Sequence, residues 1–435
     1  MKHRTLLVGL AVSCVAVAIG AIMLFTVSPS VAQDASLPVP QWAAQLETPA
    51  PAQSAPADVQ RGYYLALAGD CTSCHTREGH EPFAGGVAVN TNFGAIHGAN
   101  LTPDRETGIG SWTSDQFYRA LHSGIRADGA HLYPAFPYTS FTRLTRSDSD
   151  ALYVYLRTVT PIRYRPPANR LPPIINIRGV MTIWNALFFK PGEYHRDPSR
   201  SEEWNRGAYL VTGVAHCDAC HTPRNFLGAE EQNKPLRGNR LENWHAANLA
   251  SNMRAGLGGW SHQDIVTYLR TGRNVHAAAS GMMGQVVVNS TSHMADADLQ
   301  AIAVYLRSLA SAPENSAHAA PPDTALGASV YANNCSACHG SNAEGVPNMF
   351  PRLASDSSLQ AFDPTTIARI VLEGTRAPMT SINPTPSAMP AFGWKLSDAE
   401  VAAVLTYLRN SHGNDAPAVR ASDIGRVRAS IAHAP

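Results

Sequence analysis

Amphipathic helical patterns recur three times along this chain, each ending in the tripeptide Tyr-Leu-Arg, at residues 155–157, 305–307 and 407–409. Upstream of each tripeptide lies another predicted helix that carries a glycine, at Gly62, Gly207 and Gly327. Apolar residues at a period near 3.6, separated by Gly- and Pro-rich loops, are typical of short helices around a small core. The pattern therefore predicts an all-α fold built from three similar units.

The three units are expected at residues 58–160, 201–311 and 323–412. The first two are internal repeats, because the Ala-Asn-Leu segments that begin at Ala99 and Ala247 lie 148 residues apart, as do several later matches. The third is a shortened copy. Three further segments complete the organisation, namely a Pro-rich strap at 161–200, a linker at 312–322 and a tail at 413–435. The prolines of the strap forbid a continuous helix.

The first 32 residues form a targeting segment. Basic residues precede an apolar run at 6–27, and Ser30-Val31-Ala32 offers a small-residue cleavage site. The run is nearly long enough to span a bilayer, so a removed signal peptide and an uncleaved anchor helix remain alternatives. Both predict that the rest of the chain lies at the periplasmic face of the inner membrane. Residues 33–57, rich in Pro, Ala and Gln, are a predicted linker.

Length and charge narrow the classes of partner. A chain of 435 residues is expected to hold more than one domain. Its formal net charge of +1 is spread without a basic stripe. Nucleic acid is therefore not an expected partner.

Three copies of the motif Cys-x-x-Cys-His, at residues 71–75, 217–221 and 335–339, indicate the chemistry of the chain. Two thiols three positions apart on one helical turn can add to the two vinyl groups of one porphyrin, and the adjacent His then reaches the iron. The motifs predict three covalently bound haem c groups. The attachment residues are Cys71, Cys74, Cys217, Cys220, Cys335 and Cys338, and the proximal iron ligands are His75, His221 and His339.

Zinc and thiol redox chemistry fit the cysteines less well. A structural zinc site would combine Cys-x-x-Cys units at short spacing, whereas these motifs lie more than a hundred residues apart. A thioredoxin-like pair would need an α/β pattern around it. All six cysteines beyond the leader belong to the motifs, so none is left for a disulfide framework.

A sixth iron ligand is expected from the loop before the last helix of each unit, because an electron carrier keeps substrates off its metal. Met389 is predicted for the third unit, with Met379 as the alternative. Met283 is predicted for the second unit, ahead of Met282 and Met294.

The first unit breaks this pattern, because no Met occurs between Met23 and Met181. Phe136 stands where a Met would fit, and His131 is the predicted ligand. The alternatives are an open iron or one of the residues His97, His122 and Met181. A bis-His haem would have a lower potential than its His/Met neighbours, which suits an electron entry point.

Residues 58–410 resemble the triheme cytochrome c subunit of membrane-bound periplasmic dehydrogenases that oxidise alcohols, aldehydes or sugar acids. The resemblance rests on the three motifs at these intervals and on four further segments, Asn-Leu-Thr-Pro-Asp at 100–104, Leu-Tyr-Pro-Ala-x-Pro-Tyr at 132–138, Trp-Asn-Arg-Gly-Ala-Tyr-Leu at 204–210 and Cys-His-Thr-Pro-Arg-Asn at 220–225. It implies three class I cytochrome c domains in tandem, joined by Pro-rich linkers.

The resemblance also implies partners. In the quinoprotein alcohol dehydrogenase branch the Tyr-Pro-Ala segment usually continues with Met, whereas a branch that works with molybdenum hydroxylases resembles this chain in having Phe136. The implied partner is a catalytic aldehyde dehydrogenase subunit with molybdopterin and iron–sulfur centres. A partner with PQQ or flavin, as in alcohol or gluconate dehydrogenase, is the alternative. The implied electron acceptor is ubiquinone.

Electron transfer is accordingly the predicted function, and the chain is not expected to be catalytic alone, because no nucleophile triad or dinucleotide motif occurs. A haem peroxidase that uses an open first haem and a free-standing periplasmic shuttle are the competing functions. Residues 181–189 are expected to be a buried apolar strap, with a quinone or membrane contact as the alternative. The tail has the helical spacing of a basic interfacial helix, but a disordered tail is favoured.

Overall fold

The computed structural model describes residues 45–241, 243–310, 324–347 and 349–432. The predicted signal peptide or anchor at 1–32 lies outside these residues. Among the helices that are described, none is long and apolar enough to cross a membrane. The described chain comprises a first segment (residues 45–200), a second segment (201–310) and a third segment (324–432).

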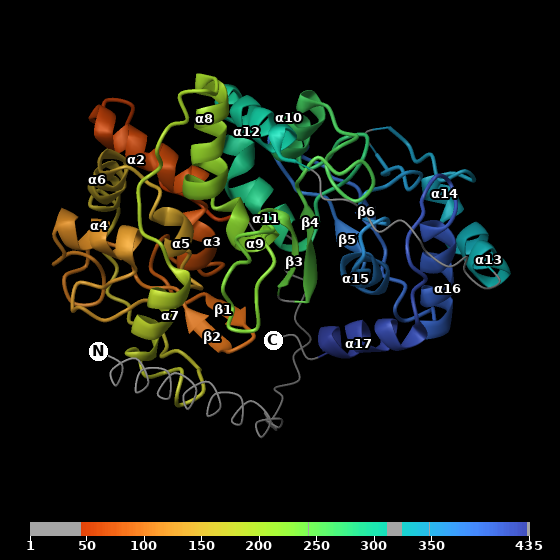
Figure 1. Ribbon diagram of the computed structural model, residues 1–435, viewed down its shortest axis with the longest axis horizontal. Helices are drawn as coiled ribbons and strands as arrows, with labels where there is room; N and C mark the ends of the chain where they lie inside the picture. The colour runs from red at the N-terminus through yellow and green to blue at the C-terminus, as the bar shows by residue number, and fades with distance from the viewer. Residues whose placement is uncertain (1–44, 242, 311–323, 348, 433–435) are drawn as a thin grey trace, which may run out of the picture. The chain divides into compact units, whose positions relative to one another are not determined.

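Helices dominate all three segments (Figure 1). The first segment contains α2 (Ala57–Ala68), α3 (Cys71–His75), β1 (Ala88–Thr91), β2 (Gly94–His97), α4 (Ser114–Ser123), α5 (Tyr138–Phe141), α6 (Arg146–Leu156) and α7 (Val180–Phe188). The second contains α8 (Glu202–Tyr209), the π-helix η1 (Leu210–Val214), α9 (Cys217–His221), β3 (Arg237–Leu241), β4 (Trp244–Asn248), α10 (His262–Thr271), α11 (Gly281–Asn289), the 3₁₀ helix η2 (Thr291–His293) and α12 (Asp296–Ser308). The third contains α13 (Ala325–Asn334), α14 (Ser336–His339), α15 (Thr365–Glu373), β5 (Thr375–Arg376), β6 (Ala388–Met389), α16 (Asp398–Arg409) and α17 (Ala421–Ala432).

The first long helix of each segment crosses the helix that carries Tyr-Leu-Arg, so that α2 packs on α6, α8 on α12 and α13 on α16. The repeated glycines lie at these crossings. A Cβ atom on Gly62 would lie 2.0 Å from a backbone oxygen of α6, and one on Gly207 would lie 1.9 Å from a backbone oxygen of α12. One on Gly327 would lie 2.2 Å from a backbone oxygen of α16. Only glycine allows so close an approach, which explains why the sequence repeats it.

Three two-stranded antiparallel sheets accompany the helices, one in each segment, and the all-α prediction missed them. They pair Ala88 with His97, Arg237 with Asn248, and Thr375 with Met389. The strands are only two to five residues long. So short a strand carries no readable apolar alternation, which is why the sequence pattern did not reveal it.

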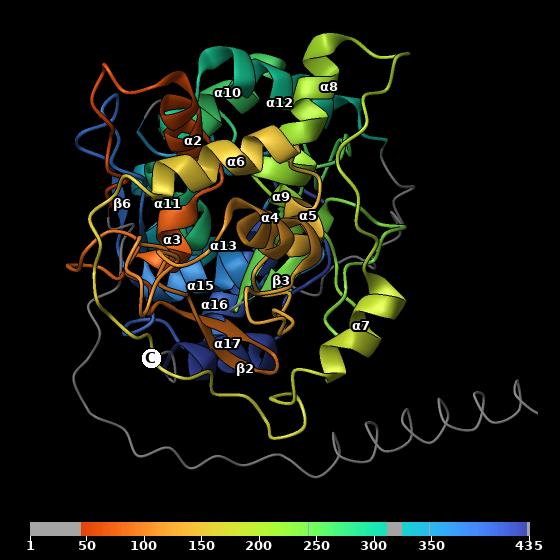
Figure 2. The ribbon, with the colours of Figure 1, turned by 90° about the vertical axis from the view of Figure 1, so that its left-hand side faces the viewer.

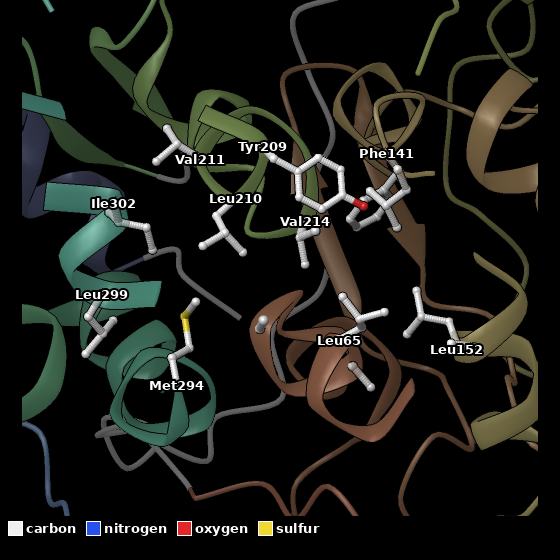
Figure 3. Close-up of a cluster of buried hydrophobic side chains, with 14 of the residues drawn as sticks. Leu65, Phe141, Leu152, Tyr209, Leu210, Val211, Val214, Met294, Leu299 and Ile302 are labelled. Atoms are coloured by element: carbon white, nitrogen blue, oxygen red, sulfur yellow. The ribbon is translucent and has the colours of Figure 1, made fainter. Parts of the chain in front are cut away.

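The first and second segments share one hydrophobic core, and the third has its own. Figure 3 shows the shared core, in which Leu65 and Leu152 of the first segment belong to one cluster with Leu210 and Leu299 of the second, and Leu65 lies near Val214. The second cluster draws all its buried members from the third segment, including Val330, Ile367, Leu372, Val401, Leu405 and Ile424.

Two reciprocal hydrogen bonds link the first two segments. The Tyr209 hydroxyl of the second segment donates to the Asp148 carboxylate of the first. Conversely, the Tyr64 hydroxyl of the first segment donates to Asp298 of the second at 2.6 Å. Arg206 also donates two hydrogen bonds to Asp298, each of 2.7 Å. The two repeats therefore exchange equivalent contacts, as a pair related by an approximate two-fold axis would.

The segments outside the three helix pairs are partly ordered. From the predicted linker at 33–57, the Pro49 carbonyl accepts a 2.7 Å hydrogen bond from Tyr155. The described part of the predicted tail, residues 413–432, is not disordered. It contains α17, in which Ile424 and Val427 are buried in the third segment's core. Apolar side chains at helical spacing thus pack against α15 and α16.

Candidate functional site

Each Cys-x-x-Cys-His motif lies at a short helix: α3 follows α2, α9 follows α8 after η1, and α14 follows α13 with Cys335 as its N-cap. Asp70 and His216, which precede α3 and α9, have φ angles of 48° and 38°. This left-handed conformation turns the chain sharply into the attachment helix. No disulfide joins the six cysteines of the motifs. Each pair of thiols lies on one helical turn, as attachment to a single porphyrin requires.

The first thiol of each motif is not activated for redox chemistry. Burial raises the pKa of Cys71 and Cys217 to about 12 and that of Cys335 to about 11. Redox-active cysteines have a lowered pKa, because the thiolate is the reactive form. The motifs therefore differ from a thioredoxin-like pair in electrostatics as well as in spacing.

The three predicted proximal histidines share one geometry. The Nδ1 atom of His75 lies 2.7 Å from the Ala99 carbonyl oxygen, and that of His221 lies 2.7 Å from the Ala247 oxygen. His339 repeats the contact at 2.9 Å with Pro351. A carbonyl oxygen only accepts hydrogen bonds, so Nδ1 carries the ring proton and Nε2 keeps its lone pair for a metal. The residues present thus fit a haem c group.

The repeated Ala-Asn-Leu segments supply two of these carbonyls. The Asn100 side-chain oxygen accepts the backbone N–H of Thr102 at 2.9 Å, and Asn248 does the same for Ala250 at 2.9 Å. Each asparagine thereby fixes the turn that presents the preceding alanine carbonyl to the histidine. The sequence leaves two roles open for Asn100 and Asn248, placing the backbone near the haem or forming a simple loop turn, and these hydrogen bonds favour the first.

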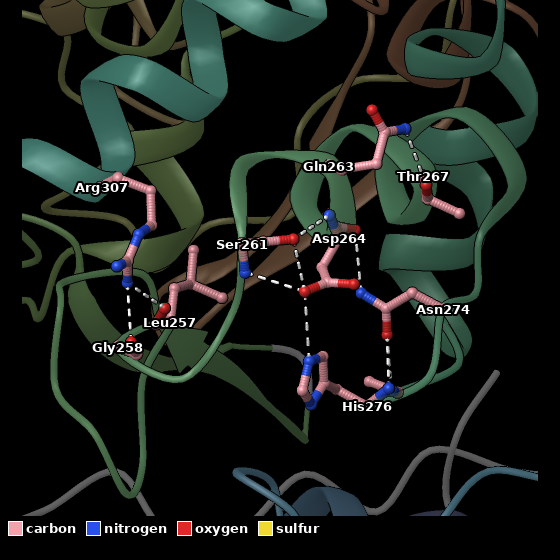
Figure 4. A network of polar contacts seen from close by, with 10 residues as sticks. Leu257, Gly258, Ser261, Gln263, Asp264, Thr267, Asn274, His276 and Arg307 are labelled. Carbon is pink, nitrogen blue, oxygen red and sulfur yellow. Dashed lines mark hydrogen bonds and ion pairs between the residues drawn. The ribbon is translucent and has the colours of Figure 1, made fainter.

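The loop that leads to Met283 is held by a polar network in the second segment (Figure 4). Asp264 caps α10 through Ser261, and its carboxylate lies 3.3 Å from His276 Nε2. The Asn274 amide donates to the Asp264 carbonyl at 2.9 Å. Met283 itself lies half-buried near the start of α11. Met294, an alternative ligand, is instead fully buried in the shared core (Figure 3).

In the third segment, Met389 is half-buried on β6, whereas the alternative Met379 is exposed. The pairing of Met389 with Thr375 fixes its place at the end of the ligand loop. Met283 and Met389 stay predictions as sixth ligands.

Equivalent hydrogen bonds align the ligand loops of the first two segments. The Leu132 N–H donates to the Gly124 carbonyl at 2.7 Å, and the Ala279 N–H donates to the Gly272 carbonyl at 2.7 Å. Four residues beyond each donor lie Phe136 and Met283. When the two loops are aligned on these hydrogen bonds, Phe136 therefore occupies the position of Met283, as the sequence also suggests.

His131 lies one residue before the aligned donor and contacts α7. Its Nδ1 atom is 3.3 Å from Asn185 Nδ2, and its carbonyl oxygen accepts a 2.6 Å hydrogen bond from Arg178. It stays the predicted ligand of the first iron. Among the alternatives, the ring of His122 stacks on Tyr118 with centroids 4.9 Å apart.

Comparison with known proteins places the chain among c-type cytochromes. The family model described as Cytochrome c matches residues 324–412. The chain is 41% identical over 391 residues to the cytochrome c subunit of alcohol dehydrogenase (quinone) from Gluconobacter oxydans, which covers 85% of this chain and 82% of that protein. It is 36% identical over 425 residues to the fructose dehydrogenase cytochrome subunit of Gluconobacter japonicus, with 90% and 87% covered.

A third relative is much longer. A nicotinate dehydrogenase subunit from Pseudomonas putida is 42% identical over 386 residues, which are 86% of this chain but only 32% of that protein. The chain thus spans about a third of the length of this relative. With the attachment helices, the histidine geometry and these matches together, the chain belongs to the family of cytochrome c subunits of dehydrogenases, which carry covalently bound haem c.

Proposed function

We propose that this chain passes electrons through three haem c groups, from a catalytic dehydrogenase subunit to ubiquinone at the periplasmic face of the inner membrane. The proposal rests mainly on one observation. The Cys-x-x-Cys-His motif occurs three times, and each time the histidine Nδ1 atom lies 2.7–2.9 Å from a backbone carbonyl oxygen. The recurrence of the glycine helix crossing in all three segments supports three cytochrome c domains in tandem.

The bound haem supplies one-electron chemistry, and the chain's residues supply its setting. The cysteines fix the group covalently. The carbonyl partners orient His75, His221 and His339 with Nε2 free to bind iron. Met283, Met389 and His131 would fill the sixth positions and exclude substrate from the metal.

For the partner, we favour an aldehyde dehydrogenase with molybdopterin and iron–sulfur centres, on the strength of Phe136 in the ligand loop. The matches to subunits of alcohol, fructose and gluconate dehydrogenases support the alternative, a partner with PQQ or flavin.

The test is purification of the complex from solubilised membranes. Mass spectrometry of the denatured chain should show the added mass of three haems, and the co-purified subunit should contain molybdopterin. A chain with fewer than three haems would overturn the tandem architecture. A partner with PQQ or flavin would overturn the choice of an aldehyde dehydrogenase but leave the electron-transfer role intact.

A haem peroxidase with an open first iron is the competing function that an observation supports. Phe136, which cannot bind iron, occupies the loop position that Met283 has in the second segment. A peroxidase would need such an open iron. Peroxide turnover by the purified chain, with a high-spin haem in its resonance spectrum, would favour that function.

A further inference from the structure

The helix α7 is inverted relative to an ordinary surface helix, because its large apolar side chains point outward. Ile183 and Leu187 are 54% and 66% exposed, and Ile177, in the turn before the helix, is 61% exposed. Ile174, slightly upstream, is 39% exposed. These four side chains are called the α7 surface. The prediction of a buried strap is wrong for this face.

Helix α7 lies near the outer edge of the ribbon in both views (Figures 1 and 2), and polar contacts hold its inner side against the chain. The Tyr138 hydroxyl donates to Asn185 Oδ1 at 2.6 Å, and Trp184 Nε1 donates to the Leu227 carbonyl at 3.0 Å. Met181, on the same face, is buried. With these contacts in place, the helix cannot roll to bury Ile183 and Leu187.

The segment of sequence that carries α7 has charges of one sign only. Residues 161–192 contain no Asp or Glu and five basic residues, Arg163, Arg165, Arg170, Arg178 and Lys190. Arg165, Arg170 and Lys190 are exposed. A segment that carries exposed cations and an outward apolar face complements a surface that is negatively charged and apolar beneath, as the head-group region of an anionic bilayer is.

The helix α17, whose sequence also suggested a membrane contact, is a weaker candidate. In α17, Ile424 and Val427 are buried against the third segment, and the Arg428 side chain donates to Asp398 at 2.8 Å. Its apolar face is already covered by protein, whereas the residues that the structure describes leave that of α7 exposed.

We propose that the α7 surface binds the interface of an anionic phospholipid bilayer, with the helix lying in the membrane plane. Nine residues of helix are too short to cross a bilayer but long enough to insert two side chains from one face. The inference rests on the proposed location at the membrane and adds the residues that would make the contact.

The test is hydrogen–deuterium exchange of the full-length, haem-loaded chain, read by mass spectrometry. Vesicles that contain phosphatidylglycerol should slow exchange at residues 180–189 at least fivefold, and vesicles of phosphatidylcholine alone should slow it less. The double change Ile183→Asp and Leu187→Asp should abolish the protection. The matched control Phe362→Asp, at an 84% exposed site in the third segment, should not. Local readout separates α7 from any contribution of the leader.

Several results would overturn the proposal. These are no protection by anionic vesicles, equal protection in the double variant, or protection that appears only when the catalytic partner is added, which would make α7 a protein interface. Protection before any vesicle is present that is lost when residues 1–44 are removed would show that the chain itself covers the surface. The haem count and the co-purified partner are measured separately, so failure here would not be confused with failure of the proposed function.

Discussion

The first two segments and the third use the same helix crossing but differ in what surrounds it. The alanines opposite the three crossing glycines, Ala151, Ala301 and Ala403, put the three closing helices in register. In that register Asp148 and Asp298 correspond to Glu400, three residues earlier in each helix. The two aspartates bind a tyrosine of the other segment, whereas Glu400 caps its own helix through Ser397.

The partner residues differ in the same way. Counted from the glycines, the positions of Tyr64 and Tyr209 correspond to Ser329, and that of Arg206 corresponds to Leu326. A serine is too short to reach a neighbouring segment. The glycine crossing therefore builds each unit. The polar residues at the edge of the crossing, such as Asp298, Tyr64 and Arg206, decide whether two units share a core.

The largest expected effect is at the crossing itself. Gly207→Val places side-chain atoms where a Cβ already lies 1.9 Å from a backbone oxygen, so α8 and α12 must separate. Overpacking of this kind costs about 3 kcal/mol. Because the core is shared, both the first and second segments should lose protection in hydrogen exchange.

The equivalent change in the third segment is the control. Gly327→Val should reduce protection of α13 and α16 and leave α2 and α12 unchanged. Loss of protection in only the second segment of Gly207→Val would contradict the shared core.

A smaller effect on stability is expected at the polar contacts of Asp298 with Arg206 and Tyr64. Burial alone would raise the pKa of Asp298, but hydrogen bonds from Arg206 and Tyr64 outweigh it and lower that pKa below its usual value. A carboxyl whose pKa is lowered on folding stabilises the protein fully above the unfolded pKa of about 4, and this stabilisation is lost as the pH falls through the folded value. Asp298→Asn should therefore cost about 1–3 kcal/mol at pH 7, and less as the pH falls below about 4.

Denaturant unfolding between pH 3 and pH 7, followed by hydrogen exchange of α8 and α12, measures this effect. Glu400→Gln is the matched control, since it should leave the first two segments unchanged. A pH-independent cost would show that Asp298 contributes only packing.

The next prediction concerns one iron at a time. Met389→Ala should remove the Met-to-iron absorption band of one haem and lower the reduction potential of that haem. If only Met283 and Met389 supply such bands, the total absorption of the band should fall by about half. His131→Ala should leave the band intact and create a high-spin signal in electron paramagnetic resonance. An unchanged resonance spectrum would exclude His131 as the ligand of the first iron.

Much of this organisation could be predicted from the sequence. The attachment cysteines, the proximal histidines and the crossing glycines are local signals that the chain repeats three times. The carbonyl partner of His75 lies 24 residues away and is set by the turn at Asn100, so no local pattern revealed it. The reciprocal contact between Tyr64 and Asp298 spans 234 residues and arises only when two segments pack together.

Surface and tail were the weakest predictions, for a physical reason. The apolar side chains of residues 181–189 suggested burial. Polar contacts of Asn185 and Trp184 instead orient the helix so that Ile183 and Leu187 face outward. The tail suggested disorder because it is short and contains Gly425, yet two buried apolar residues are enough to dock it. In both cases the outcome depends on which surface the rest of the fold offers, and composition does not encode that.

The smallest expected effect lies between the second and third segments. Arg240 forms an ion pair with Asp363 at 2.6 Å and donates to Thr365 at 2.8 Å, but its side chain is 60% exposed. Exposed ion pairs contribute about 0–1 kcal/mol and are screened by salt. Arg240→Ala should therefore change the stability of the third segment by about 0.5 kcal/mol or less at 0.15 M salt. Denaturant unfolding followed by exchange of α16 measures it, with Arg240→Lys as the control that keeps the charge. A loss above about 2 kcal/mol, larger than a surface pair can supply, would mean that the third segment depends on the second for its fold and is no separate unit.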